Sequence, residues 1–232
     1  MRCESCDIRC AICDMGQKSH ISRPISHITI LIVFFLNIFV SFAQMGKIEN
    51  AAALINQMTQ SALSVKSIES DFSQIKHINA FNRDITSSGK FYYMASDKIS
   101  MNYVNPLSYL IVINGDKIKI ESDGRKNIMH LQDNKQLNEM HSMLTACMTG
   151  NFSGISSDYR MEFYENVQFY LVTVMPVNES IKKYIIQFDI YLNKRDMSVD
   201  KLRITETESD YTEYHFSNKK FNTLNNDGLF KL

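Results

Sequence analysis

The segment GKFYYMASDKISMNYVNPLSYLIVINGDKIKI, residues 89–120, carries the clearest structural signal in the chain. Large apolar and aromatic side chains alternate in it with polar ones, which is typical of strands that bury one face. Asn114-Gly115 lies between two such runs and predicts a tight β-hairpin turn. The segment therefore predicts consecutive antiparallel strands joined by short turns.

The same alternation continues on the C-terminal side of this segment, and Asn193–Ser198 is expected to be a longer polar connection. The alternating residues are Phe91/Tyr93, Ile99/Met101/Tyr103, Ile111/Ile113, Ile118/Ile120, Met161/Phe163, Phe169/Leu171, Ile186/Phe188/Ile190, Leu202/Ile204 and Tyr214/Phe216. A sheet of this size curls strongly because its strands twist. We therefore expect a mainly β (α+β) fold, a strongly curved, half-open antiparallel β-barrel of about eleven strands.

Two segments instead show the three-to-four-residue spacing of an amphipathic helix. The N-terminal one spans Lys47–Val65, and its apolar face comprises Ile48, Ala52, Ile55, Met58, Ala62 and Val65. The inserted one ends at Gly150, and its apolar stripe comprises Leu137, Met140, Leu144, Cys147 and Met148. Helices that cover the concave face without filling it would form a lid over an apolar cavity. The alternative is a fully packed α+β domain in which the helices plug the sheet.

The N-terminal region predicts export. Ile28–Val40 reads ITILIVFFLNIFV, which is shorter than the ~18–20 residues of a spanning helix. Lys18 and Arg23 precede this run, and the small-x-small triplet Ser41–Ala43 follows it. This arrangement is typical of a signal peptide that is cleaved after Ala43. We therefore expect residues 1–43 to be leader and signal peptide, and residues 44–232 to be a single exported domain.

Four cysteines ahead of the apolar run form two C-x-x-C pairs: Cys3, Cys6, Cys10 and Cys13. Only three residues separate the pairs, whereas zinc ribbons separate them by ~15–20. Met15 opens a more ordinary signal sequence, so we interpret residues 1–14 as an upstream-start artefact or an unstructured leader. Cleavage would leave Cys147 alone, and stability would then depend on core packing.

Composition and charge exclude several classes of protein. The chain has 25 basic and 25 acidic side chains, so it lacks the positive charge of a nucleic-acid-binding protein. Its 44% hydrophobic content excludes wholesale disorder.

Candidate catalytic and metal-binding residues are few. His77, His130, His141 and His215 show no metal-ligand spacing. Ser153 in GNFSG lacks the order of a nucleophile elbow, and Cys147 lies on an apolar stripe. We interpret the acidic stretch from Glu206 to Glu213 as the solvated face of a hairpin, because it lacks a calcium-loop pattern. The sequence thus predicts no enzyme, no metal and no cofactor.

Methionine is the unusual feature of the composition, with thirteen in the chain. Several lie on faces assigned to the interior: Met58, Met101, Met140, Met148 and Met161. Flexible thioether side chains suit a surface that adapts to variable apolar ligands, and they also simply fill gaps in a core. Both interpretations stay open at the level of sequence.

The segments SIESDFSQIKH (67–77) and 89–120 together resemble the N-terminal half of the periplasmic outer-membrane lipoprotein carrier family, LolA. The matching positions are Phe72, Gln74, Gly89, Phe91, Tyr103, Pro106 and Gly115. KLRITETESDYTEYHFSNKKFN (201–222) resembles the closing hairpin of the family, at Glu206, Asp210, Thr212, Phe216 and Asn222. The resemblance implies a periplasmic, monomeric chaperone whose cavity holds lipoprotein acyl chains. It also implies loading by an inner-membrane ABC transporter and delivery to an outer-membrane acceptor.

The chain departs from the family pattern near the lid. The arginine that ties the lid shut in better-known members falls on Ala95, and the following proline falls on Ser96. Lys98 and Arg125 are candidates to replace the arginine, and Met101 stands in place of a family tryptophan.

From these patterns we expect an apolar ligand-binding cavity. Its predicted residues are Phe72, Phe91, Ile99, Met101, Leu110 and Val112 on the sheet and Leu137, Met140, Leu144 and Met148 on the lid. Two other functions remain as alternatives, a lipid-sensing regulatory module of the envelope and an enzyme acting on lipid or cell wall. The sequence disfavours the enzyme, because it shows no nucleophile paired with a base.

Overall fold

In the computed structural model, residues 45–95, 98–149 and 158–232 are described. The predicted signal peptide and the four N-terminal cysteines lie outside these residues. Within the described ranges, no helix is long and apolar enough to cross a membrane.

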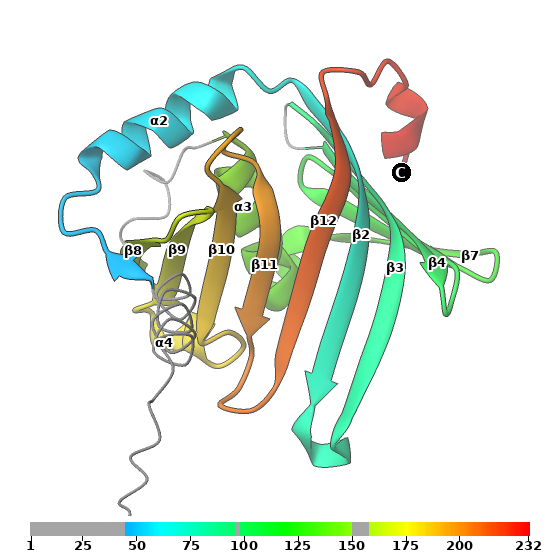
Figure 1. The fold of residues 1–232 in the computed structure, drawn as a ribbon. Helices are drawn as coiled ribbons and strands as arrows, with labels where there is room; N and C mark the ends of the chain where they lie inside the picture. The colour runs from blue at the N-terminus through cyan, green and yellow to red at the C-terminus, as the bar shows by residue number, and fades with distance from the viewer. Residues whose placement is uncertain (1–44, 96–97, 150–157) are drawn as a thin grey trace, which may run out of the picture. The chain divides into compact units, whose positions relative to one another are not determined.

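The described residues form one sheet of twelve strands in the spatial order β1-β8-β9-β10-β11-β12-β2-β3-β4-β5-β6-β7 (Figure 1). The strands are β1 (Gly46–Lys47), β2 (Ser67–Ile78), β3 (Arg83–Met94), β4 (Lys98–Asn105), β5 (Tyr109–Asn114), β6 (Lys117–Ser122), β7 (Arg125–His130), β8 (Tyr159–Glu165), β9 (Phe169–Pro176), β10 (Gln187–Asn193), β11 (Val199–Thr205) and β12 (Tyr211–Phe221). Every pairing is antiparallel. Because β1 and β7 are two unpaired edges, the sheet does not close into a full barrel. It is nevertheless strongly curved (Figure 1), which confirms the predicted half-open barrel.

Helices lie at the ends and on the concave side of the sheet, except for one 3-10 turn, η4, which covers part of the convex side (Figure 1). They are α2 (Ala52–Leu63), α3 (Lys135–Thr149), α4 (Glu179–Lys182), and the 3-10 turns η2 (Asn79–Phe81), η3 (Leu131–Asp133) and η4 (Asp227–Phe230). The inserted helix is confirmed as α3. The N-terminal helix is shorter than predicted, because Gly46 and Lys47 pair with β8 and the Ile48 N–H donates to the Phe163 carbonyl. The chain is therefore extended up to this point and becomes helical only at Ala52.

The buried face of α2 is also rotated from the predicted one. Leu54 and Met58 are its buried residues, whereas Ile55 is 37% exposed. The sequence pattern allowed both stripes, and packing against the sheet selects the one through Leu54.

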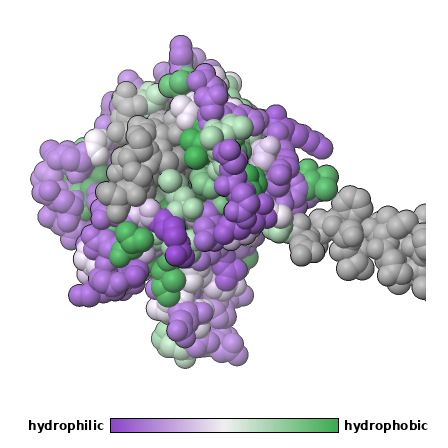
Figure 2. Space-filling model, turned by 90° about the vertical axis from the view of Figure 1, so that its left-hand side faces the viewer, coloured by the Kyte–Doolittle hydropathy of each residue, from purple (hydrophilic) through white to green (hydrophobic). Residues whose placement is uncertain are grey.

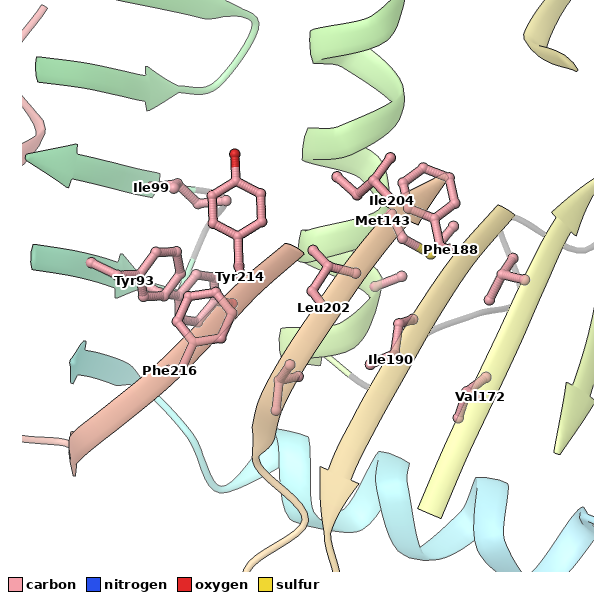
Figure 3. Close-up of a cluster of buried hydrophobic side chains, with 14 of the residues drawn as sticks. Tyr93, Ile99, Met143, Val172, Phe188, Ile190, Leu202, Ile204, Tyr214 and Phe216 are labelled. Atoms are coloured by element: carbon pink, nitrogen blue, oxygen red, sulfur yellow. The ribbon is translucent and has the colours of Figure 1, made fainter. Parts of the chain in front are cut away.

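Strand register brings one set of large side chains together on the concave face. Ile190 is directly opposite both Val172 and Leu202, and Leu202 is opposite Tyr214. Phe216 is opposite Phe72 on the neighbouring strand. Because directly opposite residues share a face, these strands build one continuous apolar surface, which Figure 3 shows in close-up.

The convex face carries charged side chains over aromatic rings. The Arg203 guanidinium lies 3.8 Å from the centroid of Tyr211, and the Lys201 ammonium lies 4.0 Å from that of Tyr191. Such cation–π contacts leave the charges in water while the rings cover the sheet. Figure 2 shows a different side of the molecule, the left-hand side of Figure 1, where hydrophilic side chains also predominate and hydrophobic ones lie among them. The two faces of the sheet thus differ sharply in polarity.

Tight turns join the consecutive strands β5, β6 and β7. Asn114 pairs with Lys117, so the predicted turn consists of Gly115 and Asp116, one residue later than expected. Gly115 has φ +62°, a conformation that glycine adopts without strain. The next turn is Asp123-Gly124, where both residues have positive φ, as a type I′ hairpin requires.

Candidate functional site

Helix α3 lies against the concave face of the sheet, and Met143 and Ala146 are its deepest described side chains, at 1% and 3% exposure. In Figure 3, Met143 lies beside Phe188 and Ile204. The central part of the interior is filled in this conformation. The gap among Phe91, Met101, Met140, Leu202, Tyr214 and Phe216 has a cavity volume of about 0 Å³.

A cavity of about 200 Å³ remains at one end of the interior, and we call it the mouth pocket. Its lining residues are Gln74, Lys76, Tyr103, Tyr109, Ile111, Gln136, Leu137, Met140, Ile185, Ile204, Glu206, Thr212 and Tyr214. It is bounded by the first turns of α3 and by the residues at the β11–β12 turn. Met140 and Tyr214 line both this pocket and the filled interior, so the two regions are continuous.

An ion pair forms part of the wall of the mouth pocket. The Lys76 Nζ donates to both carboxylate oxygens of Glu206 at 3.0 Å, and the Thr212 hydroxyl donates to Glu206 Oε1 at 3.0 Å. The Lys76 and Glu206 side chains are 36% and 17% exposed. Because the carboxylate offsets the ammonium, the pair contributes no net charge to the pocket.

Three tyrosines form the apolar-to-polar border of the pocket. The rings of Tyr103 and Tyr109 stack with centroids 4.0 Å apart, and Phe72 meets Tyr103 edge-on at 4.8 Å. The Tyr103 hydroxyl is hydrogen-bonded to those of Tyr109 and Tyr214. Burial raises the pKa of Tyr214 to about 12 and raises the pKa of Tyr103 and Tyr109 above the ordinary tyrosine value. All three therefore stay neutral at physiological pH and act as hydrogen-bonding groups.

Four predicted sheet residues lie together on the concave face. Phe72, Phe91, Ile99 and Met101 are all at most 3% exposed. Phe91 and Met101 are directly opposite each other on β3 and β4, and the rings of Phe91 and Phe216 are 5.2 Å apart.

The predicted lid residues are only partly described. Leu137 lines the mouth pocket, and Met140 lies at its boundary with the filled interior. Leu144 and Met148 belong to α3, but their side chains lie outside the described part of the structure.

The prediction for Leu110 and Val112 is wrong, because both lie on the convex face. Ile111 is opposite Met101, which places Ile111 on the concave face and its two neighbours on the other. Val112 is nevertheless 0% exposed, since η4 covers this part of the outer surface, where the Asn114 amide donates to the Phe230 carbonyl. Both faces of β5 are buried, so both sets of residues in SYLIVI are apolar and the alternation is ambiguous.

The sequence analysis missed several residues that face the interior. Met143 lies one position before the predicted Leu144, and a helical pattern does not resolve that difference. Tyr214, Phe216 and Ile204 were recognised as alternating strand residues but were not assigned to the site. Their role depends on curvature, which brings β11 and β12 opposite α3.

The candidates to replace the family arginine show no contact with α3 among the side chains that the structure describes. The Lys98 Nζ donates to Asp227 in η4 at 3.1 Å, on the convex side. Arg125 is exposed at the start of β7, and Ala95 is exposed with its N–H donating to the Lys66 carbonyl.

Among the described side chains, no three histidine, cysteine, aspartate or glutamate residues are grouped as a metal site would need. The buried surface around the site is instead apolar, with neutral hydroxyl and amide groups at one end. An open, strongly curved sheet with a helix lying on its apolar concave face is an architecture that can enclose an apolar ligand.

Comparison with known families agrees with this architecture. Residues 63–232 match the family of the outer membrane lipoprotein carrier protein LolA, and the chain belongs to this family. At the level of the family, its members are binding and carrier proteins rather than enzymes. Among curated proteins, none matches the chain.

Several solved structures are similar to the chain at low sequence identity. A LolA superfamily protein from Nitrosomonas europaea is 10% identical, with 77% of this chain and 97% of that chain covered and a TM-score of 0.41. The MucA/MucB complex of Pseudomonas aeruginosa is 10% identical, with 79% and 61% covered and a TM-score of 0.46. The lipoprotein LppX of Mycobacterium tuberculosis is 10% identical, with 76% and 99% covered and a TM-score of 0.42.

Proposed function

We propose that this protein binds the acyl chains of lipoproteins between α3 and the concave face of the sheet, and carries them from the inner to the outer membrane. The observation that carries the proposal is the continuous apolar surface that runs from the mouth pocket into the filled interior. Membership of the LolA family supports it independently.

The physical need for such a carrier follows from the cost of exposing acyl chains to water. At ~0.8 kcal/mol per methylene, a chain of about sixteen carbons carries on the order of 12 kcal/mol of unfavourable hydration. Unescorted transfer through water is therefore negligible. A carrier must offer apolar area of similar extent, and it must also be able to release the chain.

The filled interior requires that α3 move when a ligand enters. The mouth pocket of about 200 Å³ is smaller than the ~300–1,000 Å³ of typical ligand sites. Displacement of Met140 and Met143 from the sheet would open the surface of Phe91, Met101 and Phe216. Methionine suits this role, because its unbranched side chain repacks at low cost. In the proposal, Phe72, Phe91, Ile99 and Met101 form the sheet wall, and Leu137, Met140, Leu144 and Met148 belong to the lid.

The wider transport route is part of the same proposal. A signal peptide cleaved after Ala43 would deliver residues 44–232 to the periplasm as one carrier domain. An inner-membrane ABC transporter would load the domain, and an outer-membrane acceptor would receive the lipoprotein from it. No reaction is catalysed.

A charge placed on the inner side of α3 tests the proposal. Met140→Asp should weaken capture of a fluorescent sixteen-carbon fatty acid at least tenfold, because the carboxylate must be buried against the ligand. Ser142→Asp is the matched control, since Ser142 is exposed on the same helix. Equal capture by the two variants, both shown to be folded by circular dichroism, would contradict the proposed site.

Native mass spectrometry of protein purified from the cell envelope distinguishes the carrier function from the two alternative functions. Co-purifying acylated lipoprotein supports the carrier. A membrane regulatory protein as the only partner would support a lipid sensor instead, and turnover of added lipid would support an enzyme.

A further inference from the structure

The mouth pocket contains a hydrogen-bond acceptor that the packing of an apolar ligand does not explain. The amide oxygen of Gln74 is buried and has no hydrogen-bond partner among the described residues. Gln74 lines the pocket from β2, directly opposite Tyr214 in strand register. An unpaired buried acceptor is destabilising, so it marks a position where a donor from a ligand would be favourable.

Donors are available on the neighbouring strands. The two hydrogen bonds among the hydroxyls of Tyr103, Tyr109 and Tyr214 use two of their three hydrogens, which leaves one O–H to donate elsewhere. Tyr109 is half-buried, whereas Tyr103 and Tyr214 are buried. The pocket wall therefore offers one unpaired acceptor and one O–H donor close to each other along the sheet.

The charges in the pocket disfavour an anionic group. Lys76 and Glu206 are the charged lining residues, and both carboxylate oxygens of Glu206 accept from the Lys76 ammonium. A ligand carboxylate would have to compete with Glu206 for that ammonium and would lie near the negative charge of Glu206. A neutral group that both donates and accepts hydrogen bonds avoids this cost.

We propose that the mouth pocket binds the amide group of an N-acylated lipid, whose N–H donates to Gln74 Oε1 and whose carbonyl accepts from the remaining tyrosine O–H. The acyl chain then follows Ile111, Leu137 and Met140 toward the interior. This inference rests on the proposed function, because it assigns the polar end of the same ligand. An amide fits both groups at once, whereas an ester carbonyl leaves Gln74 unpaired.

Displacement of the apolar dye N-phenyl-1-naphthylamine from the purified protein tests the proposal. The four competitors share a twelve-carbon chain and differ in the polar end: dodecanamide, methyl dodecanoate, dodecanol and dodecanoate. Dodecanamide should bind about tenfold more tightly than the methyl ester, as one hydrogen bond to a buried acceptor predicts. Equal affinities of amide and ester, or tightest binding of the alcohol or carboxylate, would overturn the proposal.

Two variants test whether Gln74 causes the preference for the amide over the ester. Gln74→Leu should weaken dodecanamide about tenfold and leave the methyl ester within twofold, which removes the preference. Gln168→Leu, the same change at an exposed residue, should leave all four affinities unchanged. The ligand ranking on the unmodified protein decides the proposal even if Gln74→Leu does not fold. If the dye binds and no twelve-carbon ligand displaces it, the proposed function itself fails, which is a different outcome from equal displacement by amide and ester.

The same assay distinguishes the source of the amide. A tripalmitoyl-cysteinyl peptide carries an N-acyl amide on a lipoprotein terminus, and a ceramide carries one on a free lipid. Displacement by the peptide identifies lipoproteins, and displacement by the ceramide identifies an amide lipid. Recognition of the amide itself is decided by the ranking of the four twelve-carbon competitors.

Discussion

The filled interior and the mouth pocket lie on the same concave face, yet they differ in packing and polarity. The interior around Phe91 and Phe216 has a cavity volume of about 0 Å³, whereas the mouth pocket has about 200 Å³. The interior is apolar, while an ion pair, two amides and three tyrosine hydroxyls line the mouth. A ligand can therefore enter at the mouth without rearrangement, but it can reach the interior only by displacing α3. Binding of the polar end of a ligand at the mouth and burial of its acyl chain in the interior are therefore separate steps.

Removal of a ring from the filled interior should have the largest effect. Phe72 is 2% exposed and contacts the rings of Tyr103 and Tyr214. Phe72→Ala should lower the free energy of unfolding by about 3–5 kcal/mol, because it leaves a cavity in a packed region. Urea denaturation measures the loss. Phe81→Ala, at a residue 75% exposed in η2, should change stability by less than about 0.5 kcal/mol. Similar losses in the two variants would show that the interior is not packed as described.

A methyl group added at Gly89 should be the next most damaging change. A Cβ there would lie 2.0 Å from the carbonyl oxygen of Asn102, at a bulge between β3 and β4. Gly89→Ala should therefore cost about 3 kcal/mol, at the upper end of overpacking effects. Gly46→Ala is the control, because its Cβ would meet only a backbone oxygen at 3.8 Å. Thermal unfolding of the two variants compares them, and equal melting temperatures would contradict the tight bulge.

Alkaline pH should weaken the border between the two regions. Burial raises the pKa of Tyr214 from 10.0 to about 12, so the unfolded chain releases this proton first. The free energy of unfolding is thus unaffected by this group below pH 10, and it falls by about 1.4 kcal/mol per pH unit between pH 10 and 12. Tyr214→Phe removes that contribution, so its stability should fall less steeply with pH than that of the wild type. Parallel pH profiles in urea titrations would contradict the burial of this hydroxyl.

The smallest effect should come from the convex face of β5. Leu110→Ser should leave capture of a fluorescent fatty acid within twofold of the wild type, because Leu110 shares its face with Asn102 and Glu121. Ile111→Ser should weaken capture several-fold, since Ile111 lines the mouth pocket. If Leu110→Ser instead weakens capture more than Ile111→Ser does, Leu110 faces the cavity, as the sequence predicted.

The sequence predicts much of the fold, and the reasons for its failures are physical. Alternation identified most strands, and it placed the residues of β3, β4 and β6 on the correct face because one face of each is more apolar than the other. It failed for Leu110 and Val112, where η4 buries the outer face as well. It also missed β7, whose residues are largely exposed.

The candidate site was less predictable than the fold. Phe91 and Met101 were identified from strand alternation, and Phe72 from the resemblance to the family. The polar part of the mouth pocket depends on Lys76 and Glu206, which are 130 positions apart in sequence and meet only because β2 pairs with β12. No local pattern encodes such a contact.

Methionine-methyl NMR with a bound tripalmitoyl-cysteinyl peptide tests the central claim most directly. We expect intermolecular NOEs from acyl methylenes to Met101 and Met140, together with a changed Met143 resonance as α3 leaves Phe188 and Ile204. NOEs confined to methyl groups outside the concave face, with Met101 and Met143 unperturbed, would contradict it.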